Sequence, residues 1–156
     1  MQIQIDSREK AKAIKKILSE FDNQKIQYYV SKLYVGDYMN LDNPRVVVDR
    51  KQNLTEVCAN VCQDHERFRA ELIRAQEASI KVYVLVEHGK DISCMEDVIW
   101  WQNPRLKKSP KAITGERLYK ILQTLERKYK CKFLFCNKDQ TGRMIVEILS
   151  DDTRRN

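Results

Sequence analysis

The sequence has few of the residues that mark linkers, disulfide scaffolds or membrane spans. It contains only four glycines and three prolines among 156 residues, and it has no internal repeat, low-complexity tract or linker. Its five cysteines are an odd number with no framework spacing, which indicates free thiols in a reducing compartment. No apolar run is long enough to cross a membrane, and no signal peptide precedes the first strand pattern. These absences predict one compact cytoplasmic domain over residues 1–156.

Several common catalytic motifs are also missing. The sequence has no P-loop, no dinucleotide fingerprint and no serine-nucleophile motif. It does have an excess of positive charge, because 29 Lys and Arg against 22 Asp and Glu give a formal net charge of +7. Such an excess indicates a polyanionic partner, most simply nucleic acid, although ordinary solubility would also account for it.

Hydrophobic periodicity predicts a mixture of strands and helices. Strands are expected at Gln2–Asp6, Ile26–Lys32, Leu33–Met39, Val46–Lys51, Lys81–Glu87 and Lys132–Cys136. Helices are expected at Glu9–Asp22, from about Leu54, at Asp64–Ala78, from an N-cap at Thr114 to Lys130, and at Thr141–Leu149. Three consecutive strands argue against a doubly wound fold, so we expect an α/β sandwich with a mixed central sheet flanked by helices. The last residues, Asp151–Asn156, are expected to be frayed.

Two aspartates in neighbouring extended segments form the first candidate site. Asp37 follows Gly36, and a valine run leads into Asp49-Arg50-Lys51. Strand side chains alternate between faces, so Asp49 and Lys51 are expected on one face and Arg50 on the other. Carboxylates bind hard cations such as Mg²⁺ or Mn²⁺, which activate water and neutralise charge in phosphodiester hydrolysis. We therefore expect Asp37 and Asp49 to be metal ligands.

The neighbouring groups complete this hypothesis. The backbone carbonyl of Arg50 is expected as a third oxygen ligand, and Lys51 is expected to orient or deprotonate the attacking water or to neutralise charge. A purely structural interpretation remains open at this point. In it, Asp37 is a turn residue after Gly36, and Asp49 and Lys51 form a same-face ion pair.

Three motifs in order resemble the nuclease domain of the XPF family of structure-specific endonucleases. The motifs are Ile5-Asp6-Ser7-Arg8-Glu9, Val35-Gly36-Asp37-Tyr38 and Val48-Asp49-Arg50-Lys51. The family's signature is a G-D followed by E-R-K-x-x-x-D, within the wider PD-(D/E)-x-K pattern. The resemblance covers the chain from Gln2 to about Glu87 with motifs, and the remainder more loosely.

This resemblance implies a fold, an activity and a partner. The fold would be restriction-endonuclease-like, and the activity would be metal-dependent endonucleolytic cleavage of branched, flapped or junction DNA. Family members pair through this domain, which implies a homodimer. A nuclease domain without a helicase region or a helix-hairpin-helix domain is similar to phage or archaeal versions, and implies a prokaryotic or phage-infected cell. The alternative is a nucleic-acid-binding module of the same fold that has lost its chemistry.

The sequence departs from the family signature at two positions. Asp49 stands where the family usually has Glu, and it is one methylene shorter but still able to bind a metal. The downstream acid of the signature falls on Thr55, and the neighbouring Glu56 is a possible substitute. Glu56 also fits a capping box with Asn53, which is the interpretation we favour.

The first motif suggests two further catalytic candidates. Asp6 at a strand end is placed to approach the metal, and Glu9 is placed to bind it through water. The same two residues have the spacing of a capping box that would begin the first helix. The residues leave both interpretations open.

Basic residues elsewhere are candidates for DNA contact. Arg67 in the third helical segment is expected to face the cleft and hold a phosphate, or else to pair with Glu71 on the surface. The pair Trp100-Trp101 precedes a basic cluster in an irregular segment, a combination that suits nucleic-acid binding, although a tryptophan packed in the core beside a solvated charge run would also account for it. The predicted nucleic-acid contacts are Arg50, Arg67, Arg105, Lys107, Lys108 and Lys111. Cys58, Cys62 and His65 lack a fourth ligand, so we expect two small buried cysteines rather than a zinc site.

Overall fold

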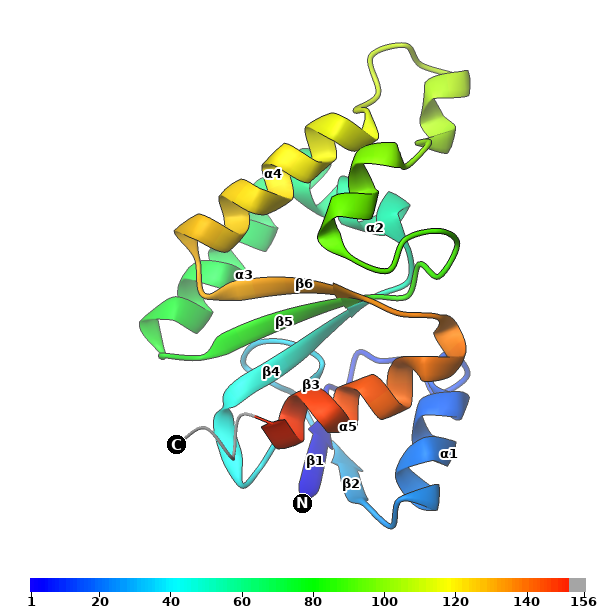
Figure 1. Ribbon diagram of the computed structural model, residues 1–156. Coiled ribbons are helices and arrows are strands. Elements are labelled where there is room, and N and C mark those ends of the chain that lie inside the picture. The colour runs from blue at the N-terminus through cyan, green and yellow to red at the C-terminus, as the bar shows by residue number, and fades with distance from the viewer. Residues whose placement is uncertain (152–156) are drawn as a thin grey trace.

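The computed structural model describes residues 1–151 and contains one six-stranded mixed sheet (Figure 1). The strands are β1 (Gln2–Ile5), β2 (Gln27–Val30), β3 (Tyr38–Asn40), β4 (Asn43–Lys51), β5 (Lys81–Val86) and β6 (Cys131–Phe135). Their order across the sheet is β2-β1-β3-β4-β5-β6. The pairs β1–β2, β4–β5 and β5–β6 are parallel, whereas β3 pairs antiparallel with both β1 and β4. The predicted α/β class with a mixed central sheet is confirmed.

Helices cover both faces of the sheet (Figure 1). The α-helices are α1 (Lys15–Asn23), α2 (Leu54–Cys58), α3 (His65–Glu77), α4 (Gly115–Lys128) and α5 (Thr141–Asp151). A π-helical turn, η1 (Ala59–Gln63), joins α2 to α3, and three 3₁₀ turns follow: η2 (Met95–Trp100), η3 (Pro104–Lys107) and η4 (Lys138–Gln140). One apolar core packs α3 and α4 against the sheet, and a second packs α1 and α5 against its other face. No helix within residues 1–151 is long and apolar enough to cross a membrane.

Strand β4 lies in the middle of the sheet and is buried on both faces. Val47 belongs to the core beneath α3 and α4, whereas Val46 and Val48 belong to the core beneath α1 and α5. The alternation continues to the end of the strand. Asp49 therefore shares the α3 face with Val47, and the Arg50 side chain points to the face covered by α1.

The predicted strand Leu33–Met39 is wrong over most of its length, because only Tyr38 and Met39 are in a strand. The segment 31–37 is an ordered loop rather than a ladder. Leu33 N–H donates to Asp6 Oδ1 over 2.8 Å, and Gly36 has a φ of +77°. A Cβ at Gly36 would lie 2.9 Å from the side chain of Val47, so this position needs glycine both for its backbone angle and for its close packing.

The first helix begins six residues later than predicted, at Lys15 instead of Glu9. The backbone turns after β1, where Glu9 N–H donates to Asp6 O over 3.1 Å. The Glu9 side chain lies against Arg50 rather than at a helix start. A capping box between Asp6 and Glu9 is therefore wrong.

Two other predicted helix starts are confirmed by their caps. Asn53 Oδ1 accepts from Glu56 N–H over 2.9 Å, which begins α2, and Thr114 Oγ1 accepts from Arg117 N–H over 3.2 Å, which begins α4. The Glu56 carboxylate accepts from the N–H of Gln52 over 2.7 Å, so Glu56 supports this helix start, but the bond falls one residue before Asn53 and the predicted capping box is only half formed. Of the tail expected to be frayed, Asp151 ends α5, and residues 152–156 lie outside the described part of the chain.

Candidate active site

A polar hollow of about 270 Å³ opens where β4 ends, between the turn after β1 and the helices α2 and α3. Charged side chains dominate its lining. The lining residues are Arg8, Glu9, Asp37, Asp49, Arg50, Lys51, Glu56, Asn60, Asp64, Arg67, Phe68 and Glu71. Segments far apart in sequence thus place acids and bases around one small space.

The two aspartates meet in this hollow. Asp37 immediately precedes β3 and Asp49 lies near the end of β4, and these two strands are neighbours in the sheet. Burial, the negative charge of Asp49 and a hydrogen bond between the two carboxyls raise the pKa of Asp37 well above its usual value. The N–H of Arg50 partly offsets this by donating to Asp37 Oδ2 over 2.8 Å. The raised pKa means that ionising both carboxyls is costly, and a positive charge between them would lower that cost.

Lys51 lies beside the aspartate pair. Its Nζ is 3.4 Å from Asp49 Oδ2, and it also lies 5.6 Å from the centre of the Phe68 ring. Burial alone would lower the pKa of Lys51, but the charges of Asp49 and Asp37 outweigh it and raise the pKa. The lysine is therefore a cation in this arrangement, suited to neutralising charge or orienting water by donating hydrogen bonds rather than to removing a proton.

Arg50 points away from Asp49 and holds a buried ionic cluster. Its Nε is 2.8 Å from Glu9 Oε2, and its Nη1 is 2.7 Å from Glu87 Oε1. The Tyr38 hydroxyl donates to the same Glu9 oxygen over 2.7 Å. Burial would lower the pKa of Arg50, but the hydrogen bonds to Glu9 and Glu87 outweigh it and raise the pKa.

This cluster corrects one prediction and limits another. The Arg50 guanidinium is buried and paired on two sides, so the expected phosphate contact by this side chain is wrong. The Glu9 carboxylate lines the hollow but is engaged by Arg50 and Tyr38. It therefore acts on Asp37 mainly through its charge, which helps to raise the pKa of that aspartate.

Asp6 is not among the residues that line the hollow. Its buried carboxylate accepts from Leu33 N–H over 2.8 Å and from Arg8 Nε over 2.7 Å. Burial would raise the pKa of Asp6, but these bonds outweigh it and lower the pKa. Asp6 therefore anchors the loop that carries Asp37, and its predicted direct approach to a metal is not supported by its position.

Five lining residues had no predicted site role: Arg8, Asn60, Asp64, Phe68 and Glu71. Glu71 Oε1 accepts from the N–H of Gly36 over 3.1 Å and so ties α3 to the turn before Asp37. Arg8 stands inside a motif that resembles the family's, which is a signal that the sequence did offer. Asn60 and Asp64 lie at the π-helical turn, and no pattern in the sequence predicts such a turn. Arg67 does face the hollow from α3, as the cleft-facing alternative required.

The donor set suits a hard divalent cation. It offers the carboxylates of Asp37 and Asp49 and the main-chain carbonyl after Asp49. Asn60 Oδ1, in the lining of the same hollow, is buried and has no hydrogen-bond partner in the described part of the chain. Within residues 1–151, however, no three His, Cys, Asp or Glu side chains are grouped to hold a metal. A cation here would therefore depend on main-chain and amide oxygens or on water as well as on the two aspartates.

The predicted basic cluster borders a second hollow of about 510 Å³. Arg105, Lys108 and Lys111 line it, together with Cys58, Cys62 and Gln63. Lys107 is exposed nearby but does not line it. The π-helical turn lies between the two hollows, because Asn60 lines the first and Cys62 the second.

Near this hollow, one tryptophan of the pair Trp100-Trp101 is exposed and the other is buried, and the same holds for Cys58 and Cys62. Trp100 is 80% exposed, whereas Trp101 is buried edge-on against His88. Cys58 is buried as expected, but Cys62 is exposed, so the expectation of two buried cysteines is half right.

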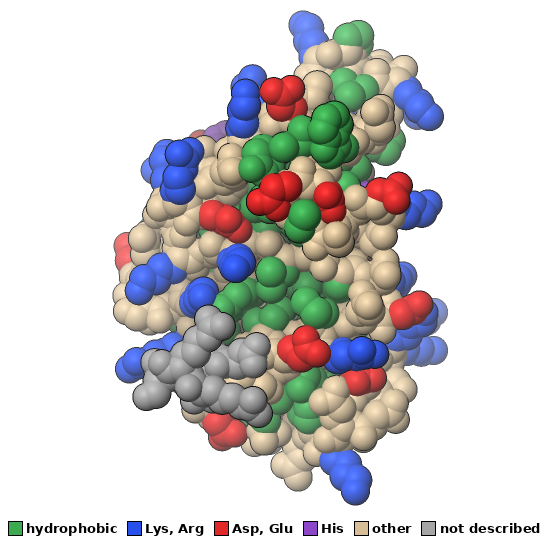
Figure 2. All heavy atoms as spheres, viewed as in Figure 1, with side chains coloured by type: hydrophobic (Ala, Val, Ile, Leu, Met, Phe, Trp, Pro, Cys, Tyr) green, Lys and Arg blue, Asp and Glu red, His purple; other side chains and the backbone are tan. Residues whose placement is uncertain are grey.

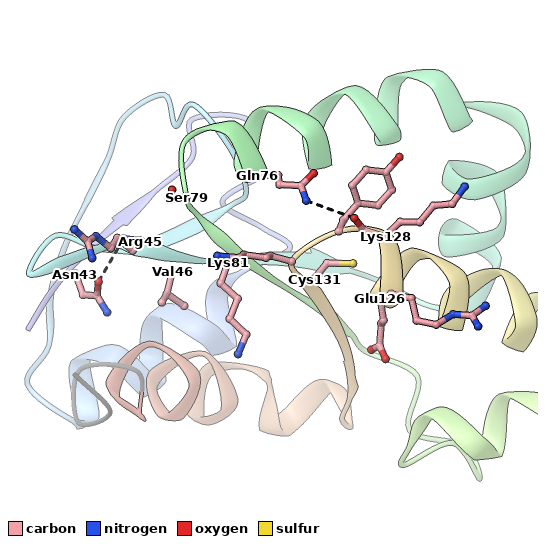
Figure 3. A pocket seen from close by; sticks show the side chains of 12 residues that line it. Asn43, Arg45, Val46, Gln76, Ser79, Lys81, Glu126, Lys128 and Cys131 are labelled. Carbon is pink, nitrogen blue, oxygen red and sulfur yellow. Dashed lines mark hydrogen bonds between the residues drawn. The ribbon is translucent and has the colours of Figure 1, made fainter.

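A larger hollow of about 730 Å³ lies at the other ends of the parallel strands (Figure 3). Basic residues surround it, among them Arg45, Lys81 and Lys128. Figure 3 shows Arg45 and Lys81 pointing apart rather than toward a common point, and Gln76 reaching from α3 to the carbonyl of Lys128. Its charges do not converge on one point. The hollow of about 270 Å³ around Asp37 and Asp49, called the acidic hollow from here on, is therefore the better candidate for chemistry.

The architecture and the acidic hollow together define a nuclease-type α/β domain. The XPF protein from Aeropyrum pernix has the same fold, with a TM-score of 0.69 at 20% identity over 99% of this chain. Its complex with DNA matches with a TM-score of 0.66 at 18% identity. This chain spans 66% of the length of that archaeal protein.

Residues 5–148 match the ERCC4 domain, so the chain belongs to the ERCC4 domain family. This is the nuclease family of XPF, as the three sequence motifs indicated. No curated protein sequence matches the chain.

Proposed function

We propose that this protein is a metal-dependent DNA endonuclease that cleaves branched, flapped or junction DNA. The observation that carries the proposal is the convergence of Asp37 and Asp49, with the Lys51 ammonium 3.4 Å from Asp49. Family membership and a DNA complex of a protein with the same fold support it.

Each residue of the site has a distinct task in this proposal. Asp37, Asp49 and the carbonyl of Arg50 would hold Mg²⁺ or Mn²⁺, which when bound supplies Lewis-acid activation of water and neutralises phosphate charge. Lys51 donates hydrogen bonds that orient the attacking water and stabilise negative charge as it develops on the phosphate. The buried Arg50 side chain, fixed between Glu9 and Glu87, keeps its own N–H aimed at Asp37.

The DNA backbone is proposed to cross both hollows. Arg67 lies at the acidic hollow, where it can hold a phosphate next to the one being cleaved. Arg105, Lys108 and Lys111 extend positive charge past the π-helical turn, with Lys107 beside them. On the face seen in Figure 2, Lys and Arg side chains are interspersed with acidic and hydrophobic side chains. The proposal rests on the basic groups that line the two hollows.

Incubation of the pure protein with labelled linear, flapped and four-way DNA, with and without Mg²⁺ or Mn²⁺, tests the proposal. Asp49→Asn should abolish metal-dependent cleavage while DNA binding and folding persist. Asp42→Asn is the matched control, because the Asp42 carboxylate is 71% exposed and lies near the N-terminus. Equal cleavage by wild type and Asp49→Asn protein would remove the catalytic assignment.

The alternative is a non-catalytic DNA-binding module of the same fold. It would show salt-dependent DNA binding without cleavage under any metal condition, and Asp49→Asn would change nothing. The homodimer implied by the family stays a prediction, and analytical ultracentrifugation of the pure chain tests it.

A further inference from the structure

Tyr34 is an exposed aromatic residue held on an ordered loop. It is 63% exposed, although its neighbours Leu33 and Val35 are buried. The loop is fixed on both sides of the tyrosine, by the Leu33 N–H bond to Asp6 and by the Gly36 N–H bond to Glu71. The tyrosine is thus presented to solvent by a backbone with little freedom left to lose on binding.

The Tyr34 ring has an arginine partner. The Arg74 guanidinium lies 5.8 Å from the centre of the ring, within the range of a cation–π contact. Arg67, Glu71 and Arg74 recur at intervals of four and three residues, so they share one face of α3. Glu71 accepts a hydrogen bond from the Gly36 N–H. Arg67 and Arg74 supply the positive charge on this face of the helix.

Tyr34 is also close to the proposed chemistry. It precedes Asp37 by three residues, a span of at most about 10 Å along the chain. Successive nucleotides of one strand in a duplex are about 3.4 Å apart, so that span corresponds to about three stacked nucleotides. Arg8 and Arg67 supply positive charge at the acidic hollow itself.

We infer that Tyr34, backed by Arg74, is a stacking platform for an unpaired base next to the cleaved phosphate. An exposed aromatic ring beside arginines can bind both the base and the phosphate of a nucleotide. The base stacks on the ring, and the phosphate pairs with a guanidinium. A fully paired duplex keeps its bases inside the stack and cannot use the platform. Tyr34 would therefore select DNA with a single-stranded segment at the cleavage position. This inference rests on the proposed function and names the substrate feature that the site reads.

Binding measurements on the 156-residue chain test the inference. Asp49→Asn protein, which should not cleave, is titrated with a flapped duplex, the same duplex with abasic nucleotides next to the junction, and a fully paired duplex. Adding Tyr34→Ala should weaken binding to the flapped DNA by about 5- to 100-fold and leave duplex binding unchanged. Tyr34→Phe and Tyr34→Trp should keep the affinity, and Tyr29→Ala, at a 39% exposed tyrosine of the edge strand β2, serves as the control.

The abasic DNA makes the test specific for stacking. Removing the base should cost the protein with intact Tyr34 as much as Tyr34→Ala costs with normal DNA, and the two changes together should cost no more than either alone. Losses that add, or a Tyr34→Ala protein that binds flapped DNA like its parent, would overturn this inference and leave the nuclease proposal standing. Absence of DNA binding when Tyr34 is intact, together with absence of metal-dependent cleavage by wild type, would overturn both.

Discussion

The main-chain N–H of Arg50 donates a hydrogen bond of 2.8 Å to Asp37 Oδ2. This bond joins the two motifs of the site, because Arg50 follows Asp49 on β4 and Asp37 precedes β3. It holds the Asp37 carboxylate next to the strand that carries Asp49. The geometry of the site thus depends on the register between two antiparallel strands, where Tyr38 pairs with Val48.

Neutralising Asp37 should stabilise the metal-free protein. The pKa of Asp37 is raised in the folded state, so the protonated carboxyl contributes to the free energy of unfolding. This contribution is complete below the unfolded pKa and is lost as pH rises through the folded pKa. Asp37→Asn removes this loss and keeps an oxygen that can accept from Arg50 N–H. The Tm of the variant should match wild type at acid pH and exceed it at neutral pH, by about 2–4 °C for each kcal/mol.

Thermal melts across pH in a chelating buffer measure this difference. Added Mg²⁺ should raise the Tm of wild type and leave Asp37→Asn almost unchanged, because a bound ion stabilises only the state that binds it. A variant that melts below wild type at neutral pH would contradict the proposed repulsion between the two aspartates.

Lys51→Ala should slow the chemical step more than it weakens metal binding. The ammonium lies beside Asp49, and its raised pKa keeps it charged, so its loss removes stabilisation of charge that develops in the transition state. We expect a fall of about 10²–10³ in the single-turnover rate at saturating metal. The Mg²⁺ concentration for half-maximal rate is the companion measurement, and a large increase in that concentration with an unchanged maximal rate would assign Lys51 to metal binding instead.

Charge reversal in the second hollow should weaken DNA binding in a salt-dependent way. Lys108→Glu and Lys111→Glu each remove a cation from its lining. Each lost phosphate contact should reduce the slope of log affinity against log salt by about 1. Lys120→Glu on α4 is the control, since that lysine is exposed and pairs with Glu116. Salt slopes equal to wild type in both lining variants would show that the DNA does not pass this hollow.

Replacement of Arg50 should unfold or strongly destabilise the protein. Arg50→Ala would leave Glu9 and Glu87 as buried carboxylates without their partner, at a cost of about 3–5 kcal/mol. Denaturant titration gives the loss, and the double change Arg50→Met with Glu87→Gln should recover part of it. If Arg50→Ala were as stable as wild type but unable to bind DNA, the arginine would be a DNA contact after all.

The sequence alone determined the class of fold and the centre of the site. A valine run ending in Asp49-Arg50-Lys51 specifies a buried strand, and the alternation of its side chains separates Asp49 and Lys51 from Arg50. These features depend on neighbours in the chain, which is why local patterns suffice for them. The turn at Gly36 was not predicted in this way, because the strand expected over Leu33–Met39 ran through it and only the purely structural alternative placed a turn there.

Only the tertiary structure decided which other charged groups complete the site. Glu9 and Glu87 are distant in sequence, and nothing local predicts that Arg50 joins them in the interior. The same holds for Glu71, whose pairing with the Gly36 N–H requires α3 to pack beside that turn. A short-range pattern predicts which face of a strand a side chain occupies, but long-range packing sets its partner across the fold. Buried charges such as these must be paired, because an unpaired charge in the interior strongly destabilises the fold.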